Sequence, residues 1–175
     1  MMALGGDDAP RNVFHVYALL RGHFGYQHPW WPGSPLEVTV AALLVQQCDW
    51  AAARDAVGRL REAGLLDLPD LAASALEEVR ACIRGVAFAP TKARRLIRLA
   101  RSVLDRGYRD IEDYLAPDRD TDALRRDLLT LEGIGEETAD CLLGFASAHR
   151  AFVVDETARR TFRRLGLFLD QGEGF

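Results

Sequence analysis

Cysteine is scarce in the 175-residue sequence, which contains only Cys48, Cys82 and Cys141, far apart along the chain. None of the intervals between them matches the short spacings of zinc-binding loops, and an iron–sulfur cluster takes four cysteine ligands. Three distant cysteines also give no support to a disulfide framework. We therefore expect no disulfide scaffold, no metal site and no cofactor.

The sequence also lacks long apolar runs and a basic start. No stretch reaches the ~18 uninterrupted apolar residues needed to cross a bilayer. The N-terminal segment contains Gly-Gly-Asp-Asp where a signal peptide has basic residues. These absences predict a cytoplasmic protein that does not enter a membrane.

Alternating runs of β-branched residues are equally scarce, whereas alanine, leucine and arginine are abundant. This composition favours helices over strands. The chain is long enough for one domain with a real core, or for one domain and part of another. We predict an all-α fold.

Lysine occurs only once, and acidic residues outnumber basic ones by 26 to 22, which gives a formal net charge of −4. This balance argues mildly against nucleic-acid binding, because affinity for phosphates is largely electrostatic. The basic residues are nevertheless concentrated in two segments, 92–101 and 159–164. Each segment is either a solvated helix face, the more frequent case, or part of one DNA-binding groove.

Two segments have the pattern of a capping box, in which a serine and a glutamate three residues later bond reciprocally to backbone N–H groups. They are Ser34-Pro-Leu-Glu37 and Ser74-Ala-Leu-Glu77, and each predicts the start of a helix. A third helix is predicted over residues 12–24, where apolar residues at helical spacing include Val13, Tyr17 and Leu20.

The most informative segment is Leu131-Glu-Gly-Ile-Gly-Glu-Glu-Thr-Ala-Asp140. Helices are predicted on both sides of it, over 121–131 and 136–148. Its two glycines allow a tight turn with main-chain N–H groups pointing outward, and such a hairpin can hold a phosphate. Further along, Asp155 lies at the predicted N-cap of a short Arg-rich helix, where backbone donors orient its carboxylate. A fixed carboxylate beside bound DNA suggests base excision.

Several segments, in this order, resemble the endonuclease III-like superfamily of helix-hairpin-helix (HhH-GPD) DNA glycosylases. The resemblance covers about residues 30–167. It rests on Gln46-Gln47-Cys48, Gly85-Val-Ala-Phe88 with Lys92-Ala93, the hairpin, and Val153-Val-Asp155 with Arg164-Leu-Gly166. A Gly-x-Gly hairpin alone is a weak indicator, but several segments in the right order are strong. The resemblance implies a helical bundle with its helix-hairpin-helix at 122–148. It also implies double-stranded DNA with a damaged base as the partner, and a place at the nucleoid.

By this resemblance, the hairpin grips the DNA backbone near the lesion through Gly133, Ile134, Gly135, Glu137 and Thr138. The glycines can equally form an ordinary helix C-cap, and both roles can hold at once. Gln46 either inserts into the stack where the flipped base was or ties helices together through its amide. Lys92 either contacts a phosphate or faces solvent.

The same resemblance assigns the excision chemistry to Asp155. Breaking the bond between base and sugar builds positive charge on the sugar, which a carboxylate stabilises while it can also activate a water. The alternative is a plain helix N-cap. Family members that also cleave the strand have a lysine at the position of Glu137, because an amine must attack the sugar to form a Schiff base. Glu137 therefore predicts a monofunctional glycosylase.

Trp30-Trp31-Pro32 and Trp50 resemble the branch that removes 3-methyladenine, in which aromatic side chains surround the extruded base. An alkylated purine is positively charged, so stacking on indole favours it over a normal base. The alternative for the three tryptophans is packing in the core. Two other functions stay open: a glycosylase for oxidised pyrimidines, and a DNA-binding protein without catalysis.

The resemblance also divides the chain. We expect a disordered N-terminus at 1–11, a helix and aromatic segment at 12–33 that contribute to a second domain, a helical domain at 34–149, and the Asp155 helix with a tail at 150–175. Family members continue with helices that pack on the N-terminal one, so we expect an incomplete second domain. The apolar surface of residues 12–24 is then exposed, covered by another chain, or folded differently.

Overall fold

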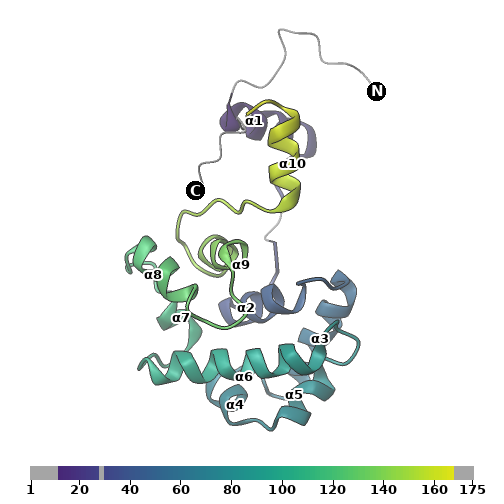
Figure 1. Ribbon diagram of the computed structural model, residues 1–175, viewed down its shortest axis with the longest axis vertical. Coiled ribbons are helices and arrows are strands. Elements are labelled where there is room, and N and C mark those ends of the chain that lie inside the picture. Colours follow the sequence, from purple (N-terminus) through teal and green to yellow (C-terminus); the bar gives the residue numbers. More distant parts are fainter. Residues whose placement is uncertain (1–11, 28–29, 168–175) are drawn as a thin grey trace. The chain divides into compact units, whose positions relative to one another are not determined.

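The structure is a computed structural model that describes residues 12–27 and 30–167. The disordered segment predicted at 1–11 lies outside this range. The described residues are helical and contain no β-strand, as the composition predicted (Figure 1). The helices in chain order are α1 Val13–Phe24, α2 Pro35–Leu44, α3 Trp50–Glu62, α4 Leu68–Ala73, α5 Leu76–Cys82, α6 Ala89–Asp105, α7 Ile111–Tyr114, α8 Thr121–Leu128, α9 Glu136–Cys141, the π-helix η1 Leu142–Ala146, and α10 Glu156–Arg164.

The chain forms two compact units. The larger unit comprises residues 30–153 and contains α2 through η1. The smaller unit joins the residues before 30 to those after 153 and contains α1 and α10. None of the helices in the described part of the chain is long and apolar enough to cross a bilayer.

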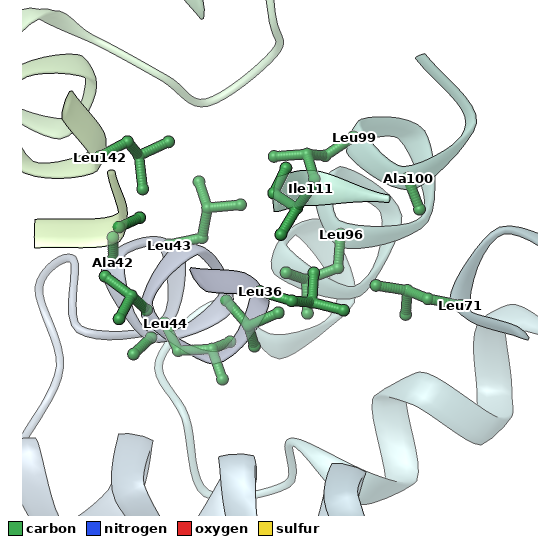
Figure 2. Packing of buried hydrophobic residues seen from close by; sticks show 14 of the residues in the cluster. Leu36, Ala42, Leu43, Leu44, Leu71, Leu96, Leu99, Ala100, Ile111 and Leu142 are labelled. Atoms are coloured by element: carbon green, nitrogen blue, oxygen red, sulfur yellow. The ribbon is translucent and has the colours of Figure 1, made fainter. Parts of the chain in front are cut away.

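Helix α2 is the centre of the larger unit. Nearly all of its side chains are buried, including the polar Thr39, whose hydroxyl donates to Pro35 O at 2.8 Å. A helix that is apolar on every side must be surrounded by others, and α2 packs against α3, α6, α7, α9 and η1. Figure 2 shows the resulting core, in which side chains from α2, α4, α6, α7 and η1 converge around Leu43 and Leu96.

Of the two predicted capping boxes, one is confirmed and one is wrong. Ser34 Oγ accepts from Glu37 N at 3.2 Å, and Glu37 Oε2 accepts from Ser34 N at 3.1 Å. Ser74 instead ends α4, which the sequence did not predict, and its hydroxyl donates back to Leu71 O at 2.8 Å. Helix α5 begins one residue later, after Ala75, without a side-chain cap.

The helix predicted over 136–148 is interrupted. It is α-helical only to Cys141 and continues as the π-helix η1, which ends at Ala146. Leu142, Leu143 and Ala146 of η1 face the core, whereas Phe145 is 46% exposed. π-turns of this kind change which side chains a helix presents and occur frequently at functional sites.

In the smaller unit, α1 has little buried surface. Asn12 caps it by accepting from His15 N at 2.9 Å, and Val16 is its one buried residue. The face predicted from Val13, Tyr17 and Leu20 is exposed. In α10 the side chain of Phe162 is buried, whereas the arginines around it are exposed.

Candidate functional site

The hairpin between α8 and α9 is shaped by one glycine with a positive φ and by two buried side chains. Gly133 has φ +88°, a conformation that favours glycine. Leu131 and Ile134 are buried in the core on either side of it, and Ile134 N donates to Leu131 O at 3.1 Å. Gly135 is extended and caps α9. The side chains anchor the loop from below while its backbone stays at the surface.

Gln46 joins the hairpin to the end of α2. Its amide Nε2 donates to Gly133 O at 3.0 Å and to Thr138 Oγ1 at 3.1 Å. The structure therefore uses Gln46 as a tie between segments, one of the two roles that the sequence left open. Because the amide is already engaged, an insertion into DNA requires both bonds to break.

A shallow groove of about 540 Å³ lies over the hairpin. It brings together six residues predicted to bind DNA, Arg95 from the basic segment 92–101, and Gln47, which was not predicted as a site residue. Gln47 is exposed and has φ +51°, which is unusual for a residue other than glycine. The predicted residues in the groove are Gln46, Gly133, Ile134, Gly135, Glu137 and Thr138.

The prediction that Lys92 contacts DNA needs correction. Its side chain is only 3% exposed, and its ammonium donates to Leu44 O at 2.8 Å and Gln46 O at 2.6 Å. Burial lowers the pKa of Lys92, with the nearby Arg95 adding to the shift. The two carbonyls belong to the last turn of α2 and the loop behind it, where no intrahelical donor is available. Lys92 holds this loop in place from inside the protein.

Acidic residues of the hairpin are paired with arginines inside the larger unit. Glu132 forms an ion pair with Arg98, and its Oε1 lies 3.9 Å from Arg95 Nε. Asp140 accepts two bonds from Arg125, at 2.7 and 3.1 Å, in the bidentate geometry typical of strong carboxylate pairs. These pairs offset the negative charge of the carboxylates at the surface of the hairpin. They also show that the basic face of α6 is partly engaged within the protein.

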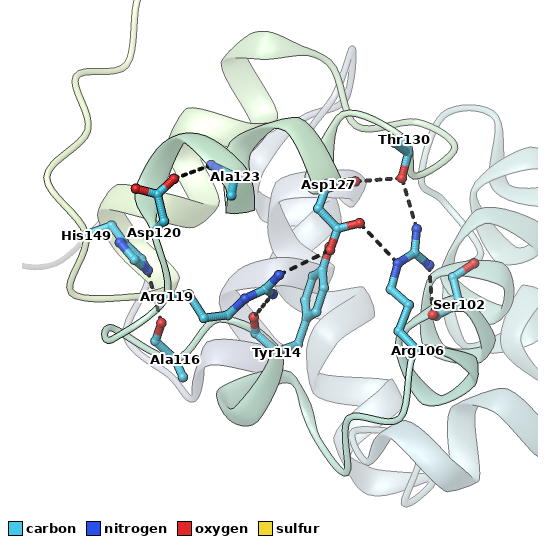
Figure 3. Close-up of polar contacts among 10 residues, drawn as sticks. All are labelled: Ser102, Arg106, Tyr114, Ala116, Arg119, Asp120, Ala123, Asp127, Thr130 and His149. Carbon is cyan, nitrogen blue, oxygen red and sulfur yellow. Dashed lines mark hydrogen bonds and ion pairs between the residues drawn. The ribbon is translucent and has the colours of Figure 1, made fainter.

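A polar network fixes the helix that leads into the hairpin (Figure 3). Asp127, near the end of α8, accepts from Arg106 at 3.2 Å and from Arg119 at 3.4 Å. Arg106 also donates to Thr130 Oγ1 at 2.9 Å. Burial, followed by the charge of Asp127, raises the pKa of Tyr114 beneath this network. The network holds the end of α8, which leads into the hairpin.

All three tryptophans of the chain meet in one aromatic cluster of the larger unit. Trp31 is buried, Trp30 is partly exposed and Trp50 is exposed. The Trp30 ring meets Trp50 edge to face, with 5.2 Å between centroids. Phe145 of η1 stacks on Trp30 at 5.7 Å with 15° between the planes, and the sequence analysis missed it. Its only signal in the sequence was a large apolar residue in a predicted helix.

Asp155 belongs to the smaller unit, where it caps α10. Its Oδ1 accepts from Ala158 N at 2.6 Å, as predicted from its position before the helix. The helix that follows has four exposed arginines, Arg159, Arg160, Arg163 and Arg164. A carboxylate fixed by a backbone donor and followed by basic side chains is suited to work beside a polyanion.

Metal-ligating side chains do not gather in the described residues: no group of three or more histidine, cysteine, aspartate or glutamate residues there can hold an ion. Cys48, Cys82 and Cys141 form no disulfide bond among the described residues.

Comparisons with known proteins agree on one family. The model of the HhH-GPD superfamily of base excision DNA repair proteins matches residues 40–173. A candidate DNA repair glycosylase of Methanocaldococcus jannaschii is 32% identical over 162 residues, which cover 92% of this chain and 73% of the relative.

Two solved structures are similar over most of the chain. The H. pylori 3-methyladenine DNA glycosylase bound to 1,N6-ethenoadenine superposes with a TM-score of 0.78 at 25% identity, covering 91% of this chain and 76% of that one. Endonuclease III in a non-covalent DNA complex gives a TM-score of 0.73 at 25% identity, covering 91% and 71%.

Proposed function

Because the chain belongs to the HhH-GPD superfamily of base excision DNA repair proteins, we propose that it is a monofunctional glycosylase for alkylated purines. The family makes it a DNA glycosylase of base excision repair. The proposal adds that it extrudes a base such as 3-methyladenine from duplex DNA and hydrolyses the glycosidic bond with water. The observation that carries this choice is the aromatic cluster that gathers every tryptophan of the chain.

The cluster suits a flat cation. An alkylated purine nucleoside carries a positive charge that an indole face attracts, whereas a normal base offers only stacking. Trp30 and Trp50 are accessible, and Trp31 supports them from the core. The alkylated base also has a weakened glycosidic bond, so the site needs no general acid. The similar H. pylori structure, a 3-methyladenine glycosylase, supports the same substrate class.

The lysine content supports hydrolysis over strand cleavage. A Schiff base requires an amine that can reach the sugar. Lys92 is the only lysine of the chain, and its amine is buried on two backbone carbonyls. At the hairpin position where strand-cleaving members have lysine, Glu137 is exposed and acidic. Water is therefore the nucleophile.

Asp155 carries the chemistry. Its bond to Ala158 N engages one carboxylate oxygen, so the other can orient a water and face the cationic sugar of the transition state. The cap also keeps the carboxylate in one conformation before DNA arrives.

The groove over the hairpin binds the DNA backbone. Its backbone amides and Arg95 supply the donors, and Gln46 keeps the loop in shape. Gln47 lines the same groove with an exposed side chain at φ +51°, so it can fill the gap left by the extruded base while Gln46 keeps its bonds to the hairpin. Strain of this kind persists where function requires it.

Release of free base tests the proposal. Duplex DNA containing 3-methyladenine is incubated with the protein, and the liberated base is separated and quantified. Asp155→Asn removes the charge but retains a good N-cap, so we expect a loss of at least about 100-fold in rate with an unchanged fold. The matched control is Asp110→Asn, because Asp110 caps α7 through a similar bond at 2.7 Å to Asp113 N.

Each other outcome has a defined meaning. Unchanged release by Asp155→Asn removes Asp155 from the mechanism. A strand break with a borohydride-trapped adduct contradicts hydrolysis, and release only of oxidised pyrimidines contradicts the substrate class. Salt-dependent duplex binding without any release leaves a DNA-binding protein that is not an enzyme.

A further inference from the structure

The contact between Phe145 and Trp30 adds little to the packing of the core. Phe145 is 46% exposed, so its ring does little to fill the core. It nevertheless lies nearly parallel to Trp30, with 5.7 Å between the ring centroids and 15° between the planes. This is an offset stack, the arrangement that an extruded base would also adopt on an indole. Phe145 therefore covers one face of the Trp30 indole.

The π-helix explains how this ring reaches Trp30. Leu142, Leu143 and Ala146 of η1 are buried in the core, whereas Phe145 projects outward. The other contacts of Trp30 are of a different kind, since Trp50 meets it edge to face and Trp31 meets it at 45°. Of the aromatic partners described, Phe145 alone stacks on its face.

Space is available for the ring to move. A cavity of about 660 Å³ is lined by Gly144, Phe145 and residues 149–153. Gly144 has no side chain to obstruct it, and a methyl group added there would have Ala151 O as its nearest neighbour, at 3.7 Å. A rotation of the Phe145 side chain about its own bonds can therefore be accommodated without moving the helix.

We propose that Phe145 occupies the stacking face of Trp30 in the DNA-free protein and is displaced into the adjoining cavity by the extruded purine. The inference rests on the proposed base-excision function and adds a residue that regulates access to its base site. In the empty protein the ring shields the indole from water. The substrate replaces one stack by another, so only a base that stacks well on Trp30 displaces Phe145.

Removal of the Phe145 ring should have opposite effects on base binding if the ring is displaced by the base and if it is a fixed wall of the pocket. If Phe145 only competes for Trp30, removing it strengthens binding of every stacking base by the same factor. If Phe145 contacts the bound base, removing it weakens binding. An aromatic stack of ordinary strength corresponds to a change between about twofold and tenfold.

Intrinsic fluorescence measures this directly, because the chain has three tryptophans and all lie in the cluster. Wild type and Phe145→Ala are titrated with 7-methylguanosine, a cationic purine nucleoside, and with guanosine as the neutral counterpart. We expect both nucleosides to bind Phe145→Ala about two- to tenfold more tightly, by the same factor. Phe14→Ala is the matched control, since Phe14 is an exposed phenylalanine of α1 in the smaller unit.

The outcomes separate this inference from the proposed function. Weaker binding by Phe145→Ala makes the ring a wall of the pocket and overturns displacement. Equal binding, or no quenching in either protein, also overturns it, because no base then competes with Phe145 for Trp30. Tighter binding without base release by wild type supports displacement while contradicting catalysis. Phe145→Leu, which keeps apolar bulk, controls for folding through its thermal unfolding curve.

Discussion

Gly133 and Gly135 of the hairpin have different requirements for glycine, one for a backbone conformation and the other for open space in the groove. Alanine substitutions distinguish the two requirements. At Gly133, φ is +88°, and an added methyl would lie 2.6 Å from Arg95 Cδ and 3.0 Å from Arg95 Nε. The left-handed conformation costs a residue with a side chain about 1–2 kcal/mol. Arg95 is flexible enough to move, at some loss of its contact with Glu132. We expect Gly133→Ala to lower the free energy of unfolding by about 1–3 kcal/mol.

Gly135 provides the matched comparison. Its backbone is extended, with φ −95°, and no heavy atom of the described chain lies within 4 Å of an added methyl. Gly135→Ala should therefore change the free energy of unfolding by less than about 1 kcal/mol, because the gain from a less flexible unfolded chain is offset by alanine being a poorer N-cap of α9. The methyl would, however, enter the groove where the proposed phosphate approaches. We expect duplex binding about tenfold weaker, equivalent to about 1.4 kcal/mol.

Two assays are sufficient. Thermal unfolding followed by far-ultraviolet circular dichroism should place Gly133→Ala roughly 2–10 °C below wild type and Gly135→Ala close to it. Fluorescence anisotropy with a labelled duplex containing a stable abasic analogue reports binding. Equal stability of the two variants would refute the backbone explanation. Undiminished binding by Gly135→Ala would show that the groove is not where the DNA backbone sits.

Three further predictions follow from other parts of the site. Lys92→Met removes the ammonium that donates to Leu44 O and Gln46 O, and it should lower the free energy of unfolding by about 2 kcal/mol. Urea titrations measure this, and an unchanged midpoint would show that water replaces the amine. Glu137→Lys should introduce a borohydride-trapped adduct with abasic DNA, whereas Glu136→Lys, about 100° around the helix, should not; equal trapping would deny a specific position. The pKa of Tyr114 is raised in the folded state, so its contribution to stability is complete below pH 10, the ordinary value, and is lost as the pH rises above it. In Tyr114→Phe the free energy of unfolding should therefore fall less between neutral and alkaline pH than in wild type. Identical curves of stability against pH for the two proteins would contradict this.

Local features of this fold were readable from the sequence because their partners are a few residues away. The Ser34 box and the Asp155 cap each close a bond over three residues. The same pattern failed at Ser74, because α4, which was not predicted, ends at this residue. The Ser74 hydroxyl donates to Leu71 O of that helix instead of capping the next one. A capping pattern shows which bonds a serine can form, and the preceding chain decides which one it does form.

The candidate site was only partly readable. The hairpin residues came together as predicted by their spacing, since they belong to one continuous segment. Lys92 was predicted to contact a phosphate or to face solvent, as an isolated lysine in a basic segment usually does. Its real partners are 46 and 48 residues away, and only packing of α6 against α2 places them within reach.

The sequence by itself determined the helical composition, the hairpin, the capped Asp155 and the absence of lysine at position 137, since each depends on residue type and on neighbours within a turn. Only the tertiary structure decided that Lys92 is buried, that Gln46 bonds across 87 residues to Gly133, and that Phe145 covers Trp30. These contacts join segments brought together by burial of α2, and hydrophobic burial is not directional. It fixes which faces meet only once the whole core is packed.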